Sequence, residues 1–115
     1  MSVEIEGLVN ATNSKLVVVL GMHRSGTSAI TRGLEVLGVN LGENLYPAAI
    51  DNPKGFWEDN DFLAINKELL AHLGYSVDQL GLIDWQMPST ATIKSLELKA
   101  ERLVSERCKK NALWG

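Results

Sequence analysis

Hydrophobic and polar positions follow two different periods in the first third of the chain. Residues 16–20, Leu-Val-Val-Val-Leu, are a continuous apolar run that ends at Gly21. Such a run is typical of a strand buried on both faces of a parallel sheet. From residue 27 to residue 37 the apolar positions recur at helical spacing, and Gly38 follows as a stop signal. The pattern predicts a strand, a glycine-bounded loop and a helix, in that order.

A second helix is expected after a turn. Asn52-Pro53-Lys54-Gly55 has the residues that a type I turn favours at its first, second and fourth positions. Apolar residues then recur at helical spacing from Phe62 to Leu73, and Gly74 ends the helix. Three acids fit the first turn, where they favour the helix dipole: Glu58, Asp59 and Asp61.

A third helix begins at Thr90 or Thr92, because either hydroxyl can cap a helix N-terminus. Its inward stripe continues to Cys108, which we interpret as a core residue rather than a nucleophile. Glu106 and Lys110 form a supporting pair on the outer face. The remaining segments are a polar tail over residues 1–14 and a loop over residues 75–89. We expect residues 15–115 to belong to one α/β domain with a parallel sheet flanked by helices.

Composition narrows the class of protein. The chain has 115 residues, 45% hydrophobic and 22% charged, with 11 Lys and Arg against 14 Asp and Glu. These values fit one globular domain and exclude a disordered or coiled-coil chain. The net charge of -3 argues against nucleic acid as a partner. The basic surplus after residue 94 alternates with acids and is interpreted as a solvated helix face.

The same composition bears on the compartment. One cysteine allows no intrachain disulfide, which favours a reducing environment. No apolar stretch approaches the roughly 20 residues of a membrane span, and no secretory signal is evident. We expect a cytoplasmic protein without a membrane partner. The sequence does not indicate an oligomeric state.

The loop between the predicted strand and helix carries the strongest chemical signal. Its sequence is Gly-Met-His-Arg-Ser-Gly-Thr-Ser over residues 21–28. Two glycines five positions apart let successive N–H groups and the helix N-terminus converge on an anion. The spacing is that of a nucleotide triphosphate loop, except that Thr27 stands where that loop has lysine. Arg24 supplies a cation inside the loop instead, which suits a less highly charged donor such as a phosphosulfate, without a metal.

This loop resembles the 5′-phosphosulfate-binding loop of the sulfotransferase family, especially its bacterial members. The segment Asn-Pro-Lys-Gly-Phe-Trp-Glu-Asp over residues 52–59 resembles a second segment of that group, and the likeness covers roughly residues 15–70. The resemblance implies a P-loop NTPase-like sulfotransferase fold. It also implies 3′-phosphoadenosine-5′-phosphosulfate as the donor of a sulfuryl group to a hydroxyl or amine of a small-molecule or glycan acceptor.

The resemblance also implies roles for residues. Arg24 would stabilise charge on the oxygen that bridges the departing phosphate and the sulfuryl group. The residues expected to bind the donor are His23, Arg24, Ser25, Gly26, Thr27 and Ser28. Glu58 is the candidate base, with a purely structural place at the helix start as the equal alternative. Tyr46, Phe56 and Trp57 would line an acceptor pocket or pack locally.

The family also has a later loop, with an Arg and a Ser, that binds the 3′-phosphate of the donor. The sequence given reaches only Ala112-Leu113-Trp114-Gly115, where a further strand would begin. We therefore expect the N-terminal part of a longer domain, either a truncated gene product or a fragment, so that the family can be right even if this chain alone is inactive. Two alternatives stay open: another P-loop nucleotide-dependent transferase or kinase, and a noncatalytic anion-binding fragment.

Overall fold

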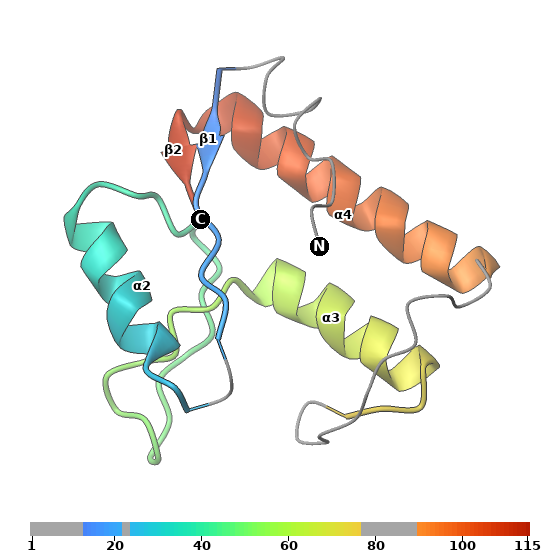
Figure 1. Ribbon diagram of the computed structural model, residues 1–115, viewed down its shortest axis with the longest axis horizontal. Coiled ribbons are helices and arrows are strands. Elements are labelled where there is room, and N and C mark those ends of the chain that lie inside the picture. The colour runs from blue at the N-terminus through green and yellow to red at the C-terminus, as the bar shows by residue number, and fades with distance from the viewer. Residues whose placement is uncertain (1–12, 22–23, 77–89) are drawn as a thin grey trace.

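The computed structural model describes residues 13–21, 24–76 and 90–115. Over these residues it is an α/β structure with three helices and a two-stranded parallel sheet (Figure 1). The elements are β1 (Lys15–Leu16), α2 (Thr27–Val36), α3 (Asn60–His72), α4 (Ala91–Lys110) and β2 (Leu113–Trp114). The predicted α/β class with parallel strands is confirmed at this level.

The sheet joins segments that are far apart in the sequence. Lys15 pairs with Leu113 and Leu16 with Trp114. On the other side of β2, Asn40 forms a parallel bridge with Trp114. The N–H of Asn40 donates to the carbonyl of Leu113 at 3.1 Å, and the N–H of Gly115 donates to the carbonyl of Asn40 at 3.1 Å. β2 is therefore the central segment, with β1 on one side and residue 40 on the other.

The first strand is shorter than the sequence predicted. The apolar run covers residues 16–20, but β1 ends at Leu16. One more hydrogen bond follows, from the N–H of Val17 to the carbonyl of Trp114 at 2.7 Å. Beyond it no segment within the described ranges pairs with the chain, and Val18 and Leu20 are 59% and 87% exposed. The expected strand over 16–20, buried on both faces, is wrong because a strand needs a paired neighbour along its whole length.

The three helices agree with the predicted positions, with one corrected start. α2 ends one residue before Leu37, and Gly38 follows with φ 94°. α3 begins at Asn60 with Asp59 as its N-cap, two residues later than the acidic turn suggested. α4 begins after Thr90, whose hydroxyl accepts from the N–H of Ile93 at 3.3 Å. Thr90 is therefore the cap, and Thr92 lies inside the helix.

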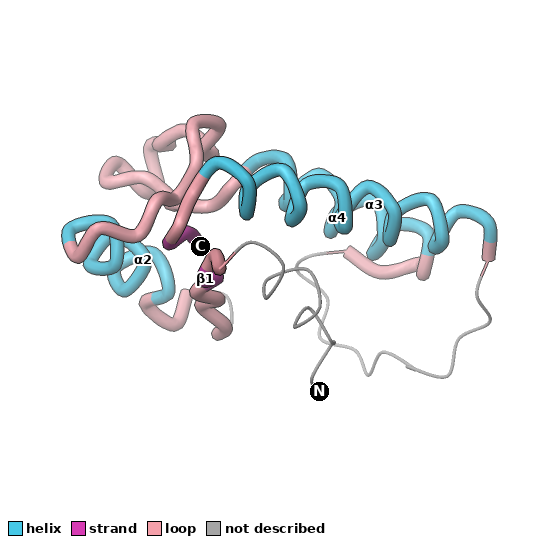
Figure 2. Tube along the Cα trace, turned by 90° about the horizontal axis from the view of Figure 1, so that it is seen from above, coloured by secondary structure: helices cyan, strands magenta, loops and turns pink. Residues whose placement is uncertain are grey.

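The core lies where α3, α4 and β2 meet. α3 and α4 run side by side (Figure 2). Val104, Cys108 and Trp114 form a buried cluster, against which Leu16 and Phe62 pack. The rings of Phe62 and Trp114 stack with their centroids 6.1 Å apart. The interpretation of Cys108 as a core residue is confirmed.

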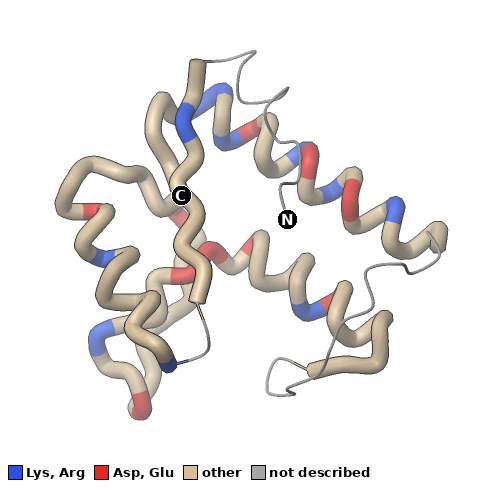
Figure 3. The backbone as a smooth tube through the Cα atoms, in the orientation of Figure 1, with Lys and Arg blue, Asp and Glu red and all other residues tan. Residues whose placement is uncertain are grey.

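The expected polar tail is wrong at its last residue. Ser14 is only 2% exposed, and its hydroxyl donates to the carbonyl of Asn111 beside β2. Residues 1–12 of that tail and 77–89 of the expected loop lie outside the described residues. Charged residues of both signs alternate along α4 (Figure 3), and its lysines are exposed. The expected solvated face is wrong at Arg107, whose side chain is only 14% exposed. Among the helices described, none has the length and hydrophobicity needed to cross a membrane.

Candidate anion-binding loop

The loop over residues 21–28 closes tightly around its first glycine. A Cβ atom on Gly21 would lie 2.6 Å from Thr27 Cγ2 and 2.8 Å from Ser25 Oγ. A side chain at residue 21 would therefore force the side chains of Ser25 and Thr27 to move. Met22 and His23 lie outside the described residues, and the expected role of His23 stays a prediction.

Two residues of the loop take up left-handed backbone conformations. Gly26 has φ 95° and Arg24 has φ 59°. Glycine adopts such a conformation without a Cβ penalty, whereas for Arg24 it costs on the order of 1–2 kcal/mol. The turn therefore includes local backbone strain at Arg24.

The loop leads directly into the N-terminus of α2. Gly26 is the N-cap and offers no side-chain acceptor to the first turn of the helix. The first N–H groups of an α-helix have no intrahelical partner, and the helix dipole adds partial positive charge at this end. Thr27 and Ser28 are half-buried, and the hydroxyl of Thr31 donates back to the carbonyl of Thr27 at 2.8 Å. This end of the helix can receive an anion through N–H and hydroxyl donors.

Arg24 is exposed at the rim of the loop. Within the described parts of the chain, no ion pair involves its guanidinium. No hydrogen bond or ion pair found there joins it to Glu58. The structure therefore brings the loop residues together but gives no contact between the two expected catalytic residues.

The second segment of the resemblance starts with the predicted turn. The N–H of Gly55 donates to the carbonyl of Asn52 at 3.1 Å, and Asn52 Nδ2 donates to the carbonyl of Gly55 at 2.9 Å. Gly55 has φ 89°. The β-turn over residues 52–55 is confirmed by its closing hydrogen bond.

Trp57 connects this segment to the helix that follows the loop. Its indole lies against Gly55, and its Nε1 donates to the carbonyl of Lys54 at 2.9 Å. The guanidinium of Arg32, on α2, lies 5.9 Å from the centre of the indole. This contact is a cation–π interaction. The contact joins the segment 52–59 to α2, the helix that the loop over residues 21–28 leads into.

The other aromatic residues of the segment also contact protein groups. The rings of Tyr46 and Phe56 meet edge to face with their centroids 5.1 Å apart, and Lys67 Nζ lies 5.5 Å from the Tyr46 ring. These contacts are those of local packing. They give no direct support to the alternative in which the aromatics line an acceptor pocket.

The three acids after Trp57 take different roles. Glu58 is exposed and precedes the cap, and its carbonyl accepts from the N–H of Tyr46 at 2.8 Å. Asp59 caps α3 by accepting from the N–H of Asp61 at 2.8 Å. Only Asp61 lies in the first turn, so the expected acidic turn of all three residues is wrong. Of the three carboxylates, that of Glu58 stays available to other groups.

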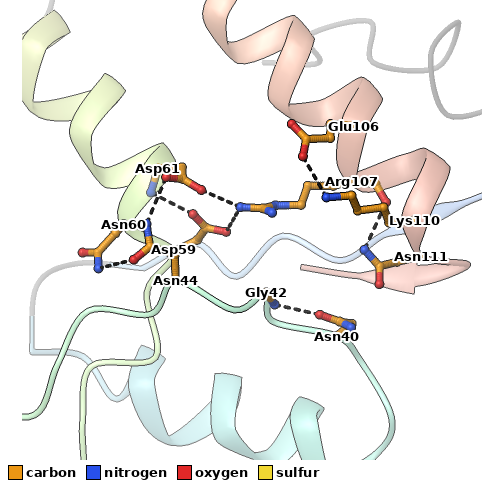
Figure 4. A network of polar contacts seen from close by, with 10 residues as sticks. All are labelled: Asn40, Gly42, Asn44, Asp59, Asn60, Asp61, Glu106, Arg107, Lys110 and Asn111. Atoms are coloured by element: carbon orange, nitrogen blue, oxygen red, sulfur yellow. Dashed lines mark hydrogen bonds and ion pairs between the residues drawn. The ribbon is translucent and has the colours of Figure 1, made fainter.

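Arg107 binds the other two carboxylates (Figure 4). Its Nη2 lies 3.0 Å from Asp59 Oδ2 and 2.7 Å from Asp61 Oδ2. The side chains of Arg107 and Asp59 are only 14% and 13% exposed. Asn44 Nδ2 donates to Asp61 Oδ1 at 3.0 Å. This network fixes the start of α3, and with it residues 57–58, against α4.

The sequence did not point to Arg107, although a signal was present. Residue 107 lies four positions after Leu103 and three after Val104, both of the inward stripe of α4. An arginine on that stripe indicates a buried acidic partner. His72 is the last residue of α3, and its Nε2 lies 3.1 Å from Oγ1 of Thr90, the cap of α4.

Comparisons with protein-family models, curated proteins and solved structures found no match for this chain. Within the described part of the chain, no three His, Cys, Asp or Glu side chains come together in a group able to hold a metal ion.

Proposed function

We propose that this chain carries the donor-binding part of a sulfotransferase that uses 3′-phosphoadenosine-5′-phosphosulfate. The observation that carries the proposal is the turn at Gly21, which lies against Ser25 and Thr27 immediately before a helix N-terminus without a side-chain cap. The α/β structure would then be part of a P-loop-like sulfotransferase fold. The domain would span residues 15–115 and continue in a longer protein.

The donor would bind through its 5′-phosphate at the end of α2. The N–H groups of Gly26, Thr27 and Ser28 and the hydroxyls of the latter two would donate to phosphate oxygens. Arg24 would lie beside the sulfuryl group, because it is exposed at the rim and engaged in no ion pair within the described chain. Ser25 and His23 complete the proposed donor site.

The reaction would be an in-line displacement at sulfur. The acceptor oxygen or nitrogen forms a bond to sulfur while the bond from sulfur to the bridging phosphate oxygen breaks. 3′-Phosphoadenosine 5′-phosphate leaves, and Arg24 stabilises the negative charge that develops on its departing oxygen. Glu58 would accept the proton of the acceptor, since it is the one carboxylate of its segment that Arg107 does not bind.

Binding measurements on this chain test the donor site without requiring turnover. Titration calorimetry would compare 3′-phosphoadenosine-5′-phosphosulfate and adenosine 5′-phosphosulfate, both in EDTA, with ATP in excess magnesium and without EDTA. We expect both phosphosulfates to bind without metal, and Arg24→Ala to weaken them at least about ten-fold, the loss of one charge-assisted contact. Arg102→Ala removes an exposed arginine of α4 and should leave binding unchanged.

The outcomes separate the alternatives. Preference for magnesium ATP over both phosphosulfates would replace the proposal by another P-loop transferase or a kinase. Binding of inorganic sulfate and phosphate as tightly as the nucleotides would favour a noncatalytic anion-binding fragment. The role of Glu58 is tested in the longer protein by measuring the rate of sulfuryl transfer against pH. If Glu58→Gln leaves this pH–rate profile unaltered, Glu58 is not the base.

A further inference from the structure

Trp57 lies immediately before Glu58, the proposed base, and its indole contacts both its own segment and α2. Its Nε1 donates to the carbonyl of Lys54 at 2.9 Å. The ring also lies against Gly55, where an added Cβ would be 3.6 Å from Nε1. On α2, the guanidinium of Arg32 lies 5.9 Å from the centre of the ring. The indole therefore connects the residues before Glu58 to the helix of the proposed donor site.

The face of α2 that Trp57 contacts is the face that carries part of this donor site. Arg32 follows Ser28 by four residues, and side chains four positions apart lie on the same face of a helix. Helical side chains also lean toward the N-terminus of their helix, which for Arg32 is the end with Ser28. Ser28 is one of the residues proposed to bind the 5′-phosphate. Trp57 therefore contacts α2 on the side of the donor.

Glu58 is also held at its backbone. Its carbonyl accepts from the N–H of Tyr46 at 2.8 Å. The next residue, Asp59, forms an antiparallel bridge with Leu45, and its carboxylate binds Arg107. Both neighbours of Glu58 in the chain are therefore fixed, the preceding one to α2 and the following one to α4.

The backbone of Trp57 is strained. Its φ is 60°, in the left-handed region that bulky side chains disfavour. Residues in such conformations cluster at active sites and ligand clamps. A glycine would make the same turn without this strain. The turn alone therefore does not explain a tryptophan at this position.

We propose that Trp57, through its contact with Arg32, is a positioning residue that holds Glu58 toward the donor site. The inference rests on the proposed function, because it concerns the placement of the proposed base. Arg32 ties the indole to α2, and the hydrogen bond to Lys54 fixes the orientation of the ring. Since general-base catalysis depends on the geometry of proton transfer, a displaced Glu58 slows turnover without weakening the binding of the donor.

NMR on this chain tests the contact itself. The ring current of the indole should shift the side-chain resonances of Arg32, and Trp57→Leu should remove that shift. The resonances of Arg102, which is exposed on α4, should stay in place and provide the control. Arg32 resonances that Trp57→Leu leaves unchanged would overturn the proposal.

Steady-state kinetics in the longer protein test the positioning. We expect Trp57→Leu to lower kcat at least about ten-fold, as a misplaced catalytic group does, and to leave the Kd of 3′-phosphoadenosine-5′-phosphosulfate unchanged. Trp57→Phe keeps a ring for Arg32 and should recover part of the rate. Phe56→Leu is the matched control and should change kcat much less, because the Phe56 ring contacts Tyr46 instead.

A double substitution separates positioning from a merely structural role. A residue that acts through Glu58 has no further effect once Glu58 is replaced, so Trp57→Leu should slow Glu58→Gln no further. An equal loss of rate in both backgrounds would overturn the proposal, while transfer by the wild type would leave the proposed function standing. A raised KM for the acceptor with unchanged kcat would place Trp57 in the acceptor site instead. A wild type that transfers no sulfuryl group would refute the proposed function, and this role of Trp57 with it.

Discussion

Gly21 and Gly33 lie on either side of the same loop–helix junction, but the space around them differs. A Cβ on Gly21 would collide with Thr27 and Ser25, whereas a Cβ on Gly33 meets nothing within 4 Å. Thr27 is β-branched and opens a helix, so its side chain has little freedom to rotate away. Gly21→Ala therefore tests the geometry of the loop, and Gly33→Ala is its control, because there the added Cβ meets no other atom.

We expect Gly21→Ala to lower the free energy of unfolding by about 1–3 kcal/mol, the usual cost of forcing extra atoms into a packed site. Gly33→Ala should raise it by about 0.5–1 kcal/mol, because glycine weakens a helix interior. Urea denaturation of both variants gives the two values. Equal effects of the two substitutions would mean that the loop does not close on Gly21.

Arg24 and Trp57 illustrate what residue types alone do not reveal. Glycines at residues 21 and 26 predict a tight turn, because few other residues allow one. Arg24 and Trp57 also have positive φ, 59° and 60°, although their side chains disfavour it. The Trp57 indole lies against Gly55 and near the guanidinium of Arg32, two contacts that accompany its conformation. Local propensity could not predict them.

At the scale of elements, the caps decide where α3 and α4 begin. Thr90 accepts from the N–H of Ile93 and also lies beside His72 at the end of α3. We expect Thr90→Ala to destabilise the chain by about 1 kcal/mol, the usual cost of losing an N-cap. Thr92→Ala, at the second residue of the same helix, should change stability by less than about 0.5 kcal/mol. Thermal unfolding, monitored by circular dichroism, measures both effects. If Thr92→Ala destabilised the chain more than Thr90→Ala, Thr90 would not be the N-cap.

The last turn of α4 has a titration that can be measured directly. The hydrogen bond from Lys110 and its charge, at 2.9 Å, hold the pKa of Glu106 below its usual value. A carboxyl with a lowered pKa stabilises the fold above its unfolded-state pKa, and this contribution fades as the pH falls through the folded value.

Lys110→Ala should therefore raise the pKa of Glu106 toward that of a free side chain. The side-chain carboxyl carbon resonance of Glu106, followed by NMR from neutral to acidic pH, measures the change. Lys109→Ala removes an adjacent lysine that does not contact Glu106 and should leave the titration in place. A pKa unmoved by Lys110→Ala would show that the pair does not form in solution.

The elements also differ in how far the sequence predicted them. Helical periodicity and caps predicted all three helices to within two residues, because these signals are local. The apolar run at 16–20 predicted a first strand longer than β1. Hydrophobicity indicates that a segment tends to join a sheet, but it does not indicate how many residues of a neighbouring strand pair with it. Likewise the acids at 58–61 indicated a helix start. Their different roles depend on a long-range contact, because Arg107 binds the carboxylates of Asp59 and Asp61 but not that of Glu58.

At the scale of the molecule, Arg107 joins α4 to residues almost fifty positions earlier in the chain. Arg107→Met would leave the Asp59 and Asp61 carboxylates side by side without a cation. We expect a loss of about 1–3 kcal/mol, reduced from that of a fully buried pair because Asp61 is 38% exposed. Arg102→Met, on the exposed side of α4, should cost less than about 0.5 kcal/mol. Chemical denaturation provides both numbers.

A double substitution tests the cause. Adding Asp61→Asn to Arg107→Met removes one of the two repelling charges and should restore part of the lost stability. If Asp61→Asn gave the same change in the wild-type and Arg107→Met backgrounds, the two residues would not interact.

The central place of β2 has a consequence for how the chain is made. β1 leaves the ribosome early, but its partner residues are Leu113 and Trp114. Until these residues have been synthesised, β1 lacks the strand with which it pairs in the structure, whereas α2 and α3 can already form from local contacts. The nascent chain therefore exposes the apolar residues of β1 at least until Trp114 has been made. A chaperone that binds short leucine- and valine-rich stretches would meet its target here, during synthesis rather than after it.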